Sequence, residues 1–216
     1  MYPEYVTDLE ILQCPSSSTY TKNAWNVDKN PANPIDPCAQ DSRASYLYFG
    51  WAILPEHIVL PGKNANAEPV DASVNPNFVN VLFNYILVPH YYTFPTDPGY
   101  GKVLDEDHTY QEAGSTAGER PLYRLREGAE RFFITDINNP GASDTAQSAL
   151  PVMWDRIAAV LQATDMTPDI GFNHLPGGSN VLYLDGHVEF VKYPSTHPIT
   201  RAFAVAISQY WRMLNP

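Results

Sequence analysis

The sequence predicts one domain of the α+β class, an antiparallel sheet with flanking helices and long Pro-rich loops. An Asp-Gly pair stands between two β-prone runs, and two other segments show helical hydrophobic periodicity. Proline accounts for 20 of the 216 residues, about twice its usual share of ~5%. Because proline breaks helices, a fold made mostly of long helices is excluded.

The composition is that of a folded, acidic chain. Hydrophobic residues make up 44% and aromatic residues 12%, which supports a core and argues against global disorder. The formal net charge is −11. This acidic balance argues against a nucleic-acid binder, which needs a basic surface, and against a peripheral protein held on anionic lipid by positive charge. The longest apolar run, Tyr46–Leu54, is too short to span a membrane.

The two cysteines flank a polar, Pro-containing segment without helical or strand periodicity. Such a segment buries little, so we expect a Cys14–Cys38 disulfide to tether residues 14–44, contributing about 3–3.5 kcal/mol. Two unrelated buried thiols are the alternative. No histidine lies between residues 1 and 56 to complete a structural zinc site there. A disulfide implies an oxidising compartment, and we expect an export signal outside the sequence shown, because the first residues contain none.

Several elements are predicted in the first half of the chain. The aromatic run Ser45–Ile53 indicates a strand, and residues 54–76 a loop. Asn75 as N-cap and Pro76 as first helical residue start a helix that ends near Pro89. Residues 90–122 are predicted to be a long functional or assembly loop. The helix repeats apolar residues on one face: Phe78, Val81, Leu82, Tyr85 and Ile86.

The second half alternates short elements with a long final helix. We expect a short helix over Leu122–Glu130, a strand over Arg131–Asp136 and a helical turn over 142–149. Pro151–Asp155 is either a strand or the start of a helix, which periodicity does not decide. Residues 197–214 are predicted to form an amphipathic helix. Its apolar face comprises Ile199, Phe203, Ala206, Ile207, Tyr210, Trp211 and Leu214.

The clearest local signal is a hairpin within residues 174–191. Asp185-Gly186 favours a two-residue type I′ turn, and Pro176–Ser179 leads into its first strand as a turn. This register leaves His187 and Glu189 on a mixed face. The other face is wholly apolar and is predicted to be the core face: Val181, Tyr183, Val188 and Phe190.

No motif for nucleophilic or phosphate chemistry is present, so a hydrolase is disfavoured. The remaining candidates could form a metal site, with calcium on the oxygens of Asp136 and Asn138, or could be turn and surface residues. We expect His174 to be structural and to donate to the Asp185 carboxylate or a turn carbonyl. The full set comprises Asp136, Asn138, Asp155, His174, Asp185, His187 and Glu189.

The segment His174–Val191 resembles the His-X9-Asp-Gly module that closes many prepilin-type, type II secretion pseudopilin-like proteins of planctomycetes and related bacteria. Leu9–Ser16 is similar to their Cys-Pro-Ser segment, and Arg124–Pro140 and Pro151–Asp155 look like one subgroup. Ten residues, not nine, separate His174 from Asp185 here, with Leu175 as the insertion. The residues matching the module are His174, Gly177, Gly178, Asn180, Asp185 and Gly186.

The resemblance implies a pilin-like sheet and a non-catalytic subunit of an extracytoplasmic filament or secretion apparatus. It implies other pilin-like subunits as partners, no cofactor, and a periplasmic or extracellular location. A hydrophobic helix and its prepilin cleavage site would precede Met1 and anchor the protein in the membrane. The competing interpretation is an extracellular module that binds calcium or another ligand through the acidic residues.

Overall fold

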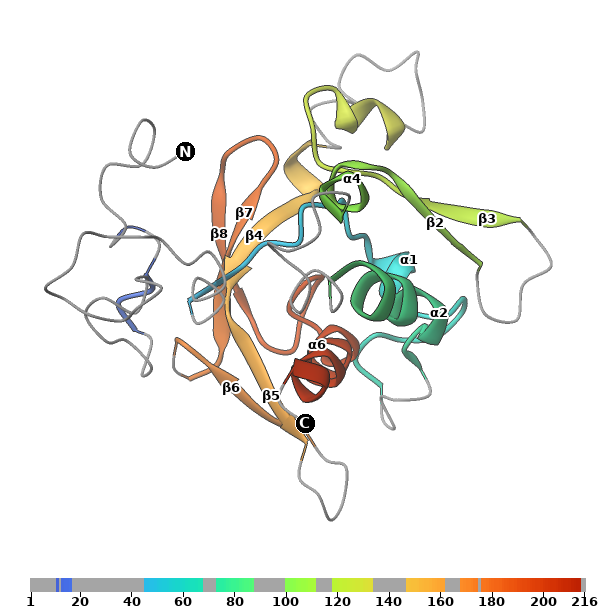
Figure 1. The fold of residues 1–216 in the computed structure, drawn as a ribbon. Coiled ribbons are helices and arrows are strands. Elements are labelled where there is room, and N and C mark those ends of the chain that lie inside the picture. Colours follow the sequence, from blue (N-terminus) through green and yellow to red (C-terminus); the bar gives the residue numbers. More distant parts are fainter. Residues whose placement is uncertain are drawn as a thin grey trace, which may run out of the picture.

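The computed structural model describes residues 11, 13–16, 45–67, 73–87, 100–111, 118–133, 147–161, 168–174 and 176–214. These residues form a four-stranded antiparallel sheet, two further two-stranded sheets and several helices. Helices pack on one face of the larger sheet, while the first described residues lie beyond the other face (Figure 1). The predicted α+β class and the antiparallel pairing are therefore confirmed.

The larger sheet has the strand order β1-β4-β7-β8. Its strands are β1 (Tyr46–Leu47), β4 (Pro151–Asp155), β7 (Gly178–Tyr183) and β8 (Val188–Lys192), and every pairing is antiparallel. The two smaller sheets are hairpins. They consist of β2 (His108–Gln111) with β3 (Glu119–Leu122), and β5 (Ile157–Leu161) with β6 (Pro168–Phe172).

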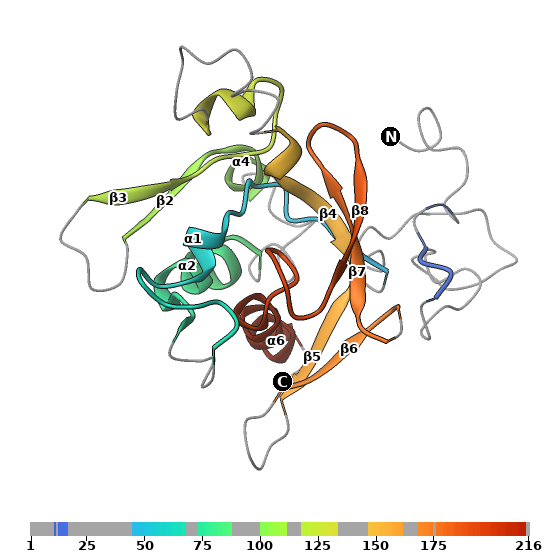
Figure 2. The same ribbon diagram turned by 180° about the vertical axis from the view of Figure 1, so that it is seen from behind.

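The helical layer covers the inner face of the larger sheet, as the view from behind also shows (Figure 2). None of the described helices is both long and apolar enough to cross a membrane. The helices are α1 (Pro55–Ile58), α2 (Pro76–Val79), the π-helix η4 (Asn80–Leu87), α4 (Tyr100–Asp105), the 3-10 helix η5 (Ala129–Phe132) and α6 (Arg201–Leu214).

The predicted helix start at Asn75 is confirmed. The Asn75 side chain accepts hydrogen bonds from the backbone N–H groups of Asn77 (3.2 Å) and Phe78 (3.4 Å), and Pro76 is the first helical residue. The helix then widens into η4, where more residues occupy each turn and the buried face moves. Phe83 is therefore buried, whereas Tyr85, predicted to face the core, is 60% exposed.

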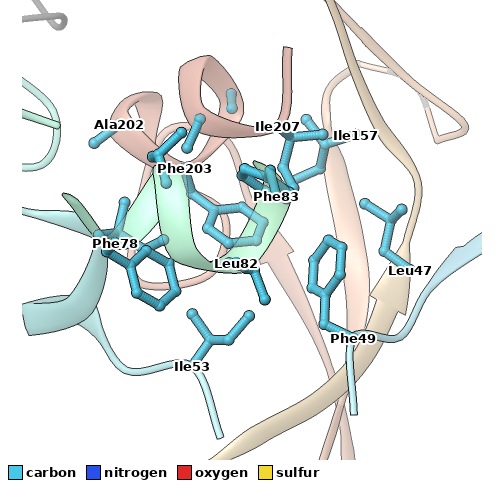
Figure 3. Packing of buried hydrophobic residues seen from close by; sticks show 14 of the residues in the cluster. Leu47, Phe49, Ile53, Phe78, Leu82, Phe83, Ile157, Ala202, Phe203 and Ile207 are labelled. Carbon is cyan, nitrogen blue, oxygen red and sulfur yellow. The ribbon is translucent and has the colours of Figure 1, made fainter. Parts of the chain in front are cut away.

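The core lies between the inner face of the larger sheet and the helices (Figure 3). Phe49, which follows β1, contacts aromatic rings from three other elements. Its ring centroid lies 5.8 Å from that of Trp154 on β4, 6.0 Å from Phe83 on η4 and 6.5 Å from Phe203 on α6. Tilted and edge-on aromatic pairs of this kind stabilise by about 0.5–1.5 kcal/mol beyond their buried area. One aromatic cluster thus joins the sheet to two helices.

In the part of α6 whose side chains the structure describes, residues 202–208 are all buried, so the burial is not limited to one face. It begins at Arg201, later than the predicted 197, because the Thr200 hydroxyl accepts from the Phe203 N–H (3.2 Å) as an N-cap. Ala202, Ala204 and Ala206 are fully buried, and such small side chains let neighbouring elements approach closely. The side chains predicted on the last turns, Tyr210, Trp211 and Leu214, lie outside the described residues.

Three predictions in the first half of the chain are wrong in part. The strand over 45–53 is limited to Tyr46–Leu47, with one further bridge between Trp51 and Arg124. The predicted loop 54–76 contains α1, and the predicted loop 90–122 contains α4 and the β2–β3 hairpin. Strands β2 and β3 have no clear hydrophobic alternation, because β2 buries only Tyr110 and β3 buries only Leu122.

Between residues 122 and 161 the outcomes differ. The predicted helix over 122–130 is wrong except for the start of η5, and Arg131 and Phe132, predicted to be in a strand, belong to this 3-10 helix. The Phe132 ring stacks on Tyr123 at 4.3 Å, which favours a folded-back turn over an extended strand. Pro151–Asp155 is a strand, and the chain continues into β5. Residues 134–146 lie outside the described residues.

The predicted hairpin exists, but its register differs by one residue. The Gly186 N–H donates to the Tyr183 carbonyl (2.9 Å) and the Tyr183 N–H to the His187 carbonyl (3.0 Å), which gives a three-residue loop. Gly186 has φ +91°, as the left-handed third loop residue requires. The slip turns β8 over, so Val188 (61% exposed) and Phe190 (49% exposed) lie outside the core.

Gly186→Val should lower the free energy of unfolding by about 1–3 kcal/mol, because a β-branched residue is strained at positive φ. A Cβ at this position meets no atom within 4 Å, so the backbone conformation alone is tested. Gly118→Val is the matched control, since Gly118 has equally open surroundings and lacks a positive φ. Equal chemical denaturation curves for the two variants would contradict the turn assignment.

Two histidines hold the chain around α1 in the interior. His57 accepts from the Leu54 N–H at Nδ1 (3.2 Å), and the His197 ring nitrogen Nε2 donates to the Ile53 carbonyl (2.8 Å). Burial lowers the pKa of His57 to about 4, and repulsion from His197 contributes. Burial likewise lowers the pKa of His197 to about 4. Both rings are therefore neutral in the folded protein at pH 7.

Mild acid should destabilise the fold through these two rings. The unfolded chain binds protons near pH 6.5 and the folded chain only near pH 4, so stability falls as pH drops through this window. Between pH 7 and 5.5 we expect a loss of about 1 kcal/mol per histidine. Urea denaturation at both pH values measures it. His197→Gln should reduce the pH dependence by about half, and an unchanged dependence would contradict burial of a neutral ring.

Candidate functional site

The outer face of the larger sheet carries a polar cluster centred on Asp155. Pro151 pairs with Tyr183, but Met153 pairs with Leu182, so β4 contains one extra residue at Val152. This β-bulge reverses the alternation of side chains along β4. As a result Trp154 points into the core beside Val181, and the next residue, Asp155, points to the outer face.

Asp155 is a buried carboxylate, with a side chain only 2% exposed. Its Oδ2 accepts from the backbone N–H of Asn180 (2.7 Å) and from the Asn180 side-chain amide (2.8 Å). The ring nitrogen Nε2 of His174 lies 3.0 Å from the same oxygen. A buried carboxylate is costly unless it is hydrogen-bonded, and these contacts supply that compensation.

A tight turn brings His174 over β7. His174 forms an isolated antiparallel bridge with Gly178, so the chain reverses between them. Gly177 has φ +135°, which favours glycine. At Gly178 a Cβ would lie 2.5 Å from Cζ of Phe190 and 2.8 Å from the Val191 carbonyl oxygen, so a side chain is excluded. The two glycines thus allow the loop to fold back along the strand as far as Asn180.

Cys14 completes the cluster from a distant part of the chain. Its Sγ lies 3.4 Å from Nε2 of His174, and the residue is 1% exposed. Figures 1 and 2 show residues 13–16 on the side of the sheet opposite α6. Cys14 therefore contacts the outer face where β4, β7 and the β6–β7 turn meet.

The electrostatics of the cluster disfavour a reactive thiolate. Burial raises the pKa of the Cys14 thiol, and the nearby Asp155 carboxylate raises it further. A nucleophilic cysteine requires the opposite shift. The relay geometry is also absent, because Cys14 and Asp155 both approach the same ring nitrogen of His174. A catalytic triad places them on opposite nitrogens.

The prediction that His174 contacts the Asp185 carboxylate is wrong. Asp185 instead accepts from the backbone N–H of His187 (3.1 Å) and pairs with its ring Nδ1 (2.6 Å) at the exposed hairpin tip. The hydrogen bond from the His187 backbone N–H is the largest cause that holds the pKa of Asp185 below its usual value, and the contact with the His187 ring lowers it further. His174 reaches only to Asn180 along β7, and its partner is Asp155. The expected structural role of His174 thus involves a different carboxylate.

The acidic and histidine candidates do not form one site in the part of the chain that the structure describes. Asp155 joins His174, and Asp185 joins His187 at the hairpin tip. Glu189 is exposed on β8. Asp136 and Asn138, the proposed calcium ligands, lie outside the described residues, so calcium binding there stays a prediction.

Sequence reasoning missed Cys14 as a member of the cluster. No histidine lies between residues 1 and 56, so the sequence argued against a metal site near Cys14. In the structure His174, 160 residues away in the sequence, contacts the Cys14 sulfur. Cys14 carries a free thiol in the structure. Cys38 lies outside the described residues, so the Cys14–Cys38 disulfide stays a prediction, and it would leave no thiolate at Cys14 for a metal ion.

Comparison with known proteins gives no match for this chain among protein-family models, curated proteins or solved structures.

Asp155→Asn should lower the free energy of unfolding by about 1–3 kcal/mol, because the neutral amide oxygen is a weaker acceptor than the carboxylate for the two N–H donors of Asn180. Asp185→Asn is the matched control at the exposed histidine–carboxylate pair, and should change stability by less than about 0.5 kcal/mol. Chemical denaturation of both variants under a metal chelator measures the difference. A smaller loss for Asp155→Asn than for Asp185→Asn would contradict the central role of this carboxylate.

Proposed function

We propose that this chain is the globular part of a non-catalytic, pseudopilin-like subunit of an extracytoplasmic filament or secretion apparatus. The observation that carries the proposal is how the His174–Val191 segment uses its polar groups. His174 and Asn180 contact the Asp155 carboxylate, and Asp185 contacts His187. Polar groups bonded to one another hold a shape, which suits a structural module better than an enzyme.

The layered arrangement supports a pilin-like interpretation of the fold. Helices cover the inner face of the larger sheet, while the outer face meets the segment around Cys14. In the proteins that this chain resembles, a long hydrophobic helix precedes the Cys-Pro-Ser segment. A helix entering through Cys14 would reach the outer face beside Val188 and Phe190, whose exposed apolar side chains it could cover.

The proposal includes location and partners. The helix ahead of Met1 would anchor the protein in the membrane, and the globular part would lie in the periplasm or outside the cell. Its partners would be other pilin-like subunits, and assembly would need no cofactor. The direct test is protease digestion of cells that make the protein, first intact and then with the outer membrane made permeable. We expect digestion in intact cells for an extracellular domain, or only after permeabilisation for a periplasmic one, with a cytosolic protein protected in both as control. Protection in both preparations would contradict the proposal.

In this proposal the anchoring helix drives polymerisation, so residues 1–216 alone should be monomeric or weakly associated by light scattering. Val188→Ser should weaken any residual association, because Val188 is 61% exposed on the outer face. Tyr85→Ser, at a 60% exposed site on η4, should not. A large obligate oligomer of residues 1–216 would contradict this mode of assembly.

An extracellular binding module is the second candidate. The observation that favours it is the convergence of three metal-ligating side chains, Cys14, Asp155 and His174, within 4.8 Å of one another. A binding site and a structural role are compatible, because a bound ion can hold the N-terminal segment on the sheet.

A further inference from the structure

We propose that Sγ of Cys14, Oδ2 of Asp155 and Nε2 of His174 together bind one divalent transition-metal ion, of which zinc is the best match. This inference does not depend on the filament proposal, since it concerns only these three side chains and their supports. The ion would link the N-terminal segment to the outer face of the sheet.

Two of the three ligand pairs already have nearly the spacing that zinc requires, and all three ligand atoms lie within 4.8 Å of one another. Around a tetrahedral zinc ion, a thiolate sulfur and an imidazole nitrogen lie about 3.6 Å apart, and an imidazole nitrogen and a carboxylate oxygen about 3.4 Å. The Cys14–His174 distance is 3.4 Å and the His174–Asp155 distance is 3.0 Å. Shifts of a few tenths of an ångström would admit the ion without moving the backbone.

The convergence on one nitrogen distinguishes a metal site from a proton relay. Nε2 of His174 faces both the thiol and the carboxylate, so all three atoms point toward a common centre. A single proton on Nε2 can be donated well to only one of the two neighbours, the Cys14 sulfur or the Asp155 carboxylate. A metal ion bound to the Nε2 lone pair would interact with both. On binding, the Cys14 thiol gives its proton to solvent, and the neutral imidazole carries its proton on Nδ1.

The surroundings hold the ligands in place as metal sites typically do. The backbone N–H and the side-chain amide of Asn180 both donate to Oδ2 of Asp155, and they orient this carboxylate. The bulge at Val152 turns Asp155 outward, and the bridge to Gly178 fixes the backbone of His174. Two of the three ligands are therefore positioned by β-structure rather than by loops alone.

The donor set selects the class of ion. Thiolate and imidazole suit zinc and neighbouring transition metals, while calcium and magnesium take oxygen ligands. Three protein ligands leave a fourth tetrahedral position. The His174 side chain is 25% exposed, so water reaches this edge of the cluster while Asp155 stays buried. Solvent would supply the fourth ligand.

Zinc titration of the chelator-stripped protein, kept reduced so that Cys14 remains a thiol, tests the inference. We expect one ion per chain and a higher melting temperature with zinc, because an ion bound only by the folded state stabilises it. His174→Ala should weaken binding by more than about 100-fold, since losing a hydrogen-bonding partner of a ligand alone typically costs 10–100-fold. His187→Ala is the matched control, because its exposed pair with Asp185 has no cysteine beside it and should bind unchanged.

The absorption spectrum of bound cobalt tests the site in the unaltered protein, so the main result does not depend on whether a variant folds. Co²⁺ in the unaltered protein should show the intense sulfur-to-metal absorption of a thiolate ligand and the visible bands of a tetrahedral site, and Cys14→Ser should lose the former. No uptake by the reduced, stripped protein would overturn the proposal. Equal zinc affinity in His174→Ala and the unaltered protein, or a cobalt spectrum without the sulfur band, would overturn it as well.

Discussion

The buried carboxylate of Asp155 must be hydrogen-bonded, and this requirement fixes how several segments of the structure lie relative to one another. The Asp155 carboxylate is nearly inaccessible to water, and an isolated charge in such a place would cost several kcal/mol. Its contacts come from two N–H groups of Asn180 and the ring of His174, and the Ser179 hydroxyl donates to the Asp155 backbone carbonyl (3.1 Å). The two central strands and the turn before β7 are therefore fixed relative to one another through a single residue. The N-terminal segment joins them through Cys14.

Features that depend on a few neighbouring residues were predictable from the sequence. Asn75-Pro76 starts a helix because the cap and the fixed proline φ act within one turn, and Asp185-Gly186 marks a hairpin for similar reasons. The exact register was not predictable. A two-residue loop and a three-residue loop both accept this pair, and the apolar pattern favoured the wrong one by placing Phe190 in the core.

The candidate site was predictable only in part. Asp155 and His174 are candidates from the sequence because carboxylate and imidazole side chains near a predicted sheet are possible metal ligands. Cys14 is instead predicted to form a disulfide with Cys38, because its contact with His174 depends on how distant segments pack. The direction of Asp155 was also hidden, since the bulge falls at Val152, an ordinary strand residue that carries no turn or bulge signal. Long-range packing and strand parity are the two kinds of information that local patterns lack.

The bulge, rather than the length of β4, decides which face each later side chain of this strand occupies. Side chains alternate with a period of two, so a regular strand of the same length would exchange the two faces after Val152. Trp154 would then leave the core, and Asp155 would enter it without its partners. Removing Val152 would instead leave a regular strand in which Trp154 still pairs with Val181, so a related chain that is one residue shorter here would keep the same outer face.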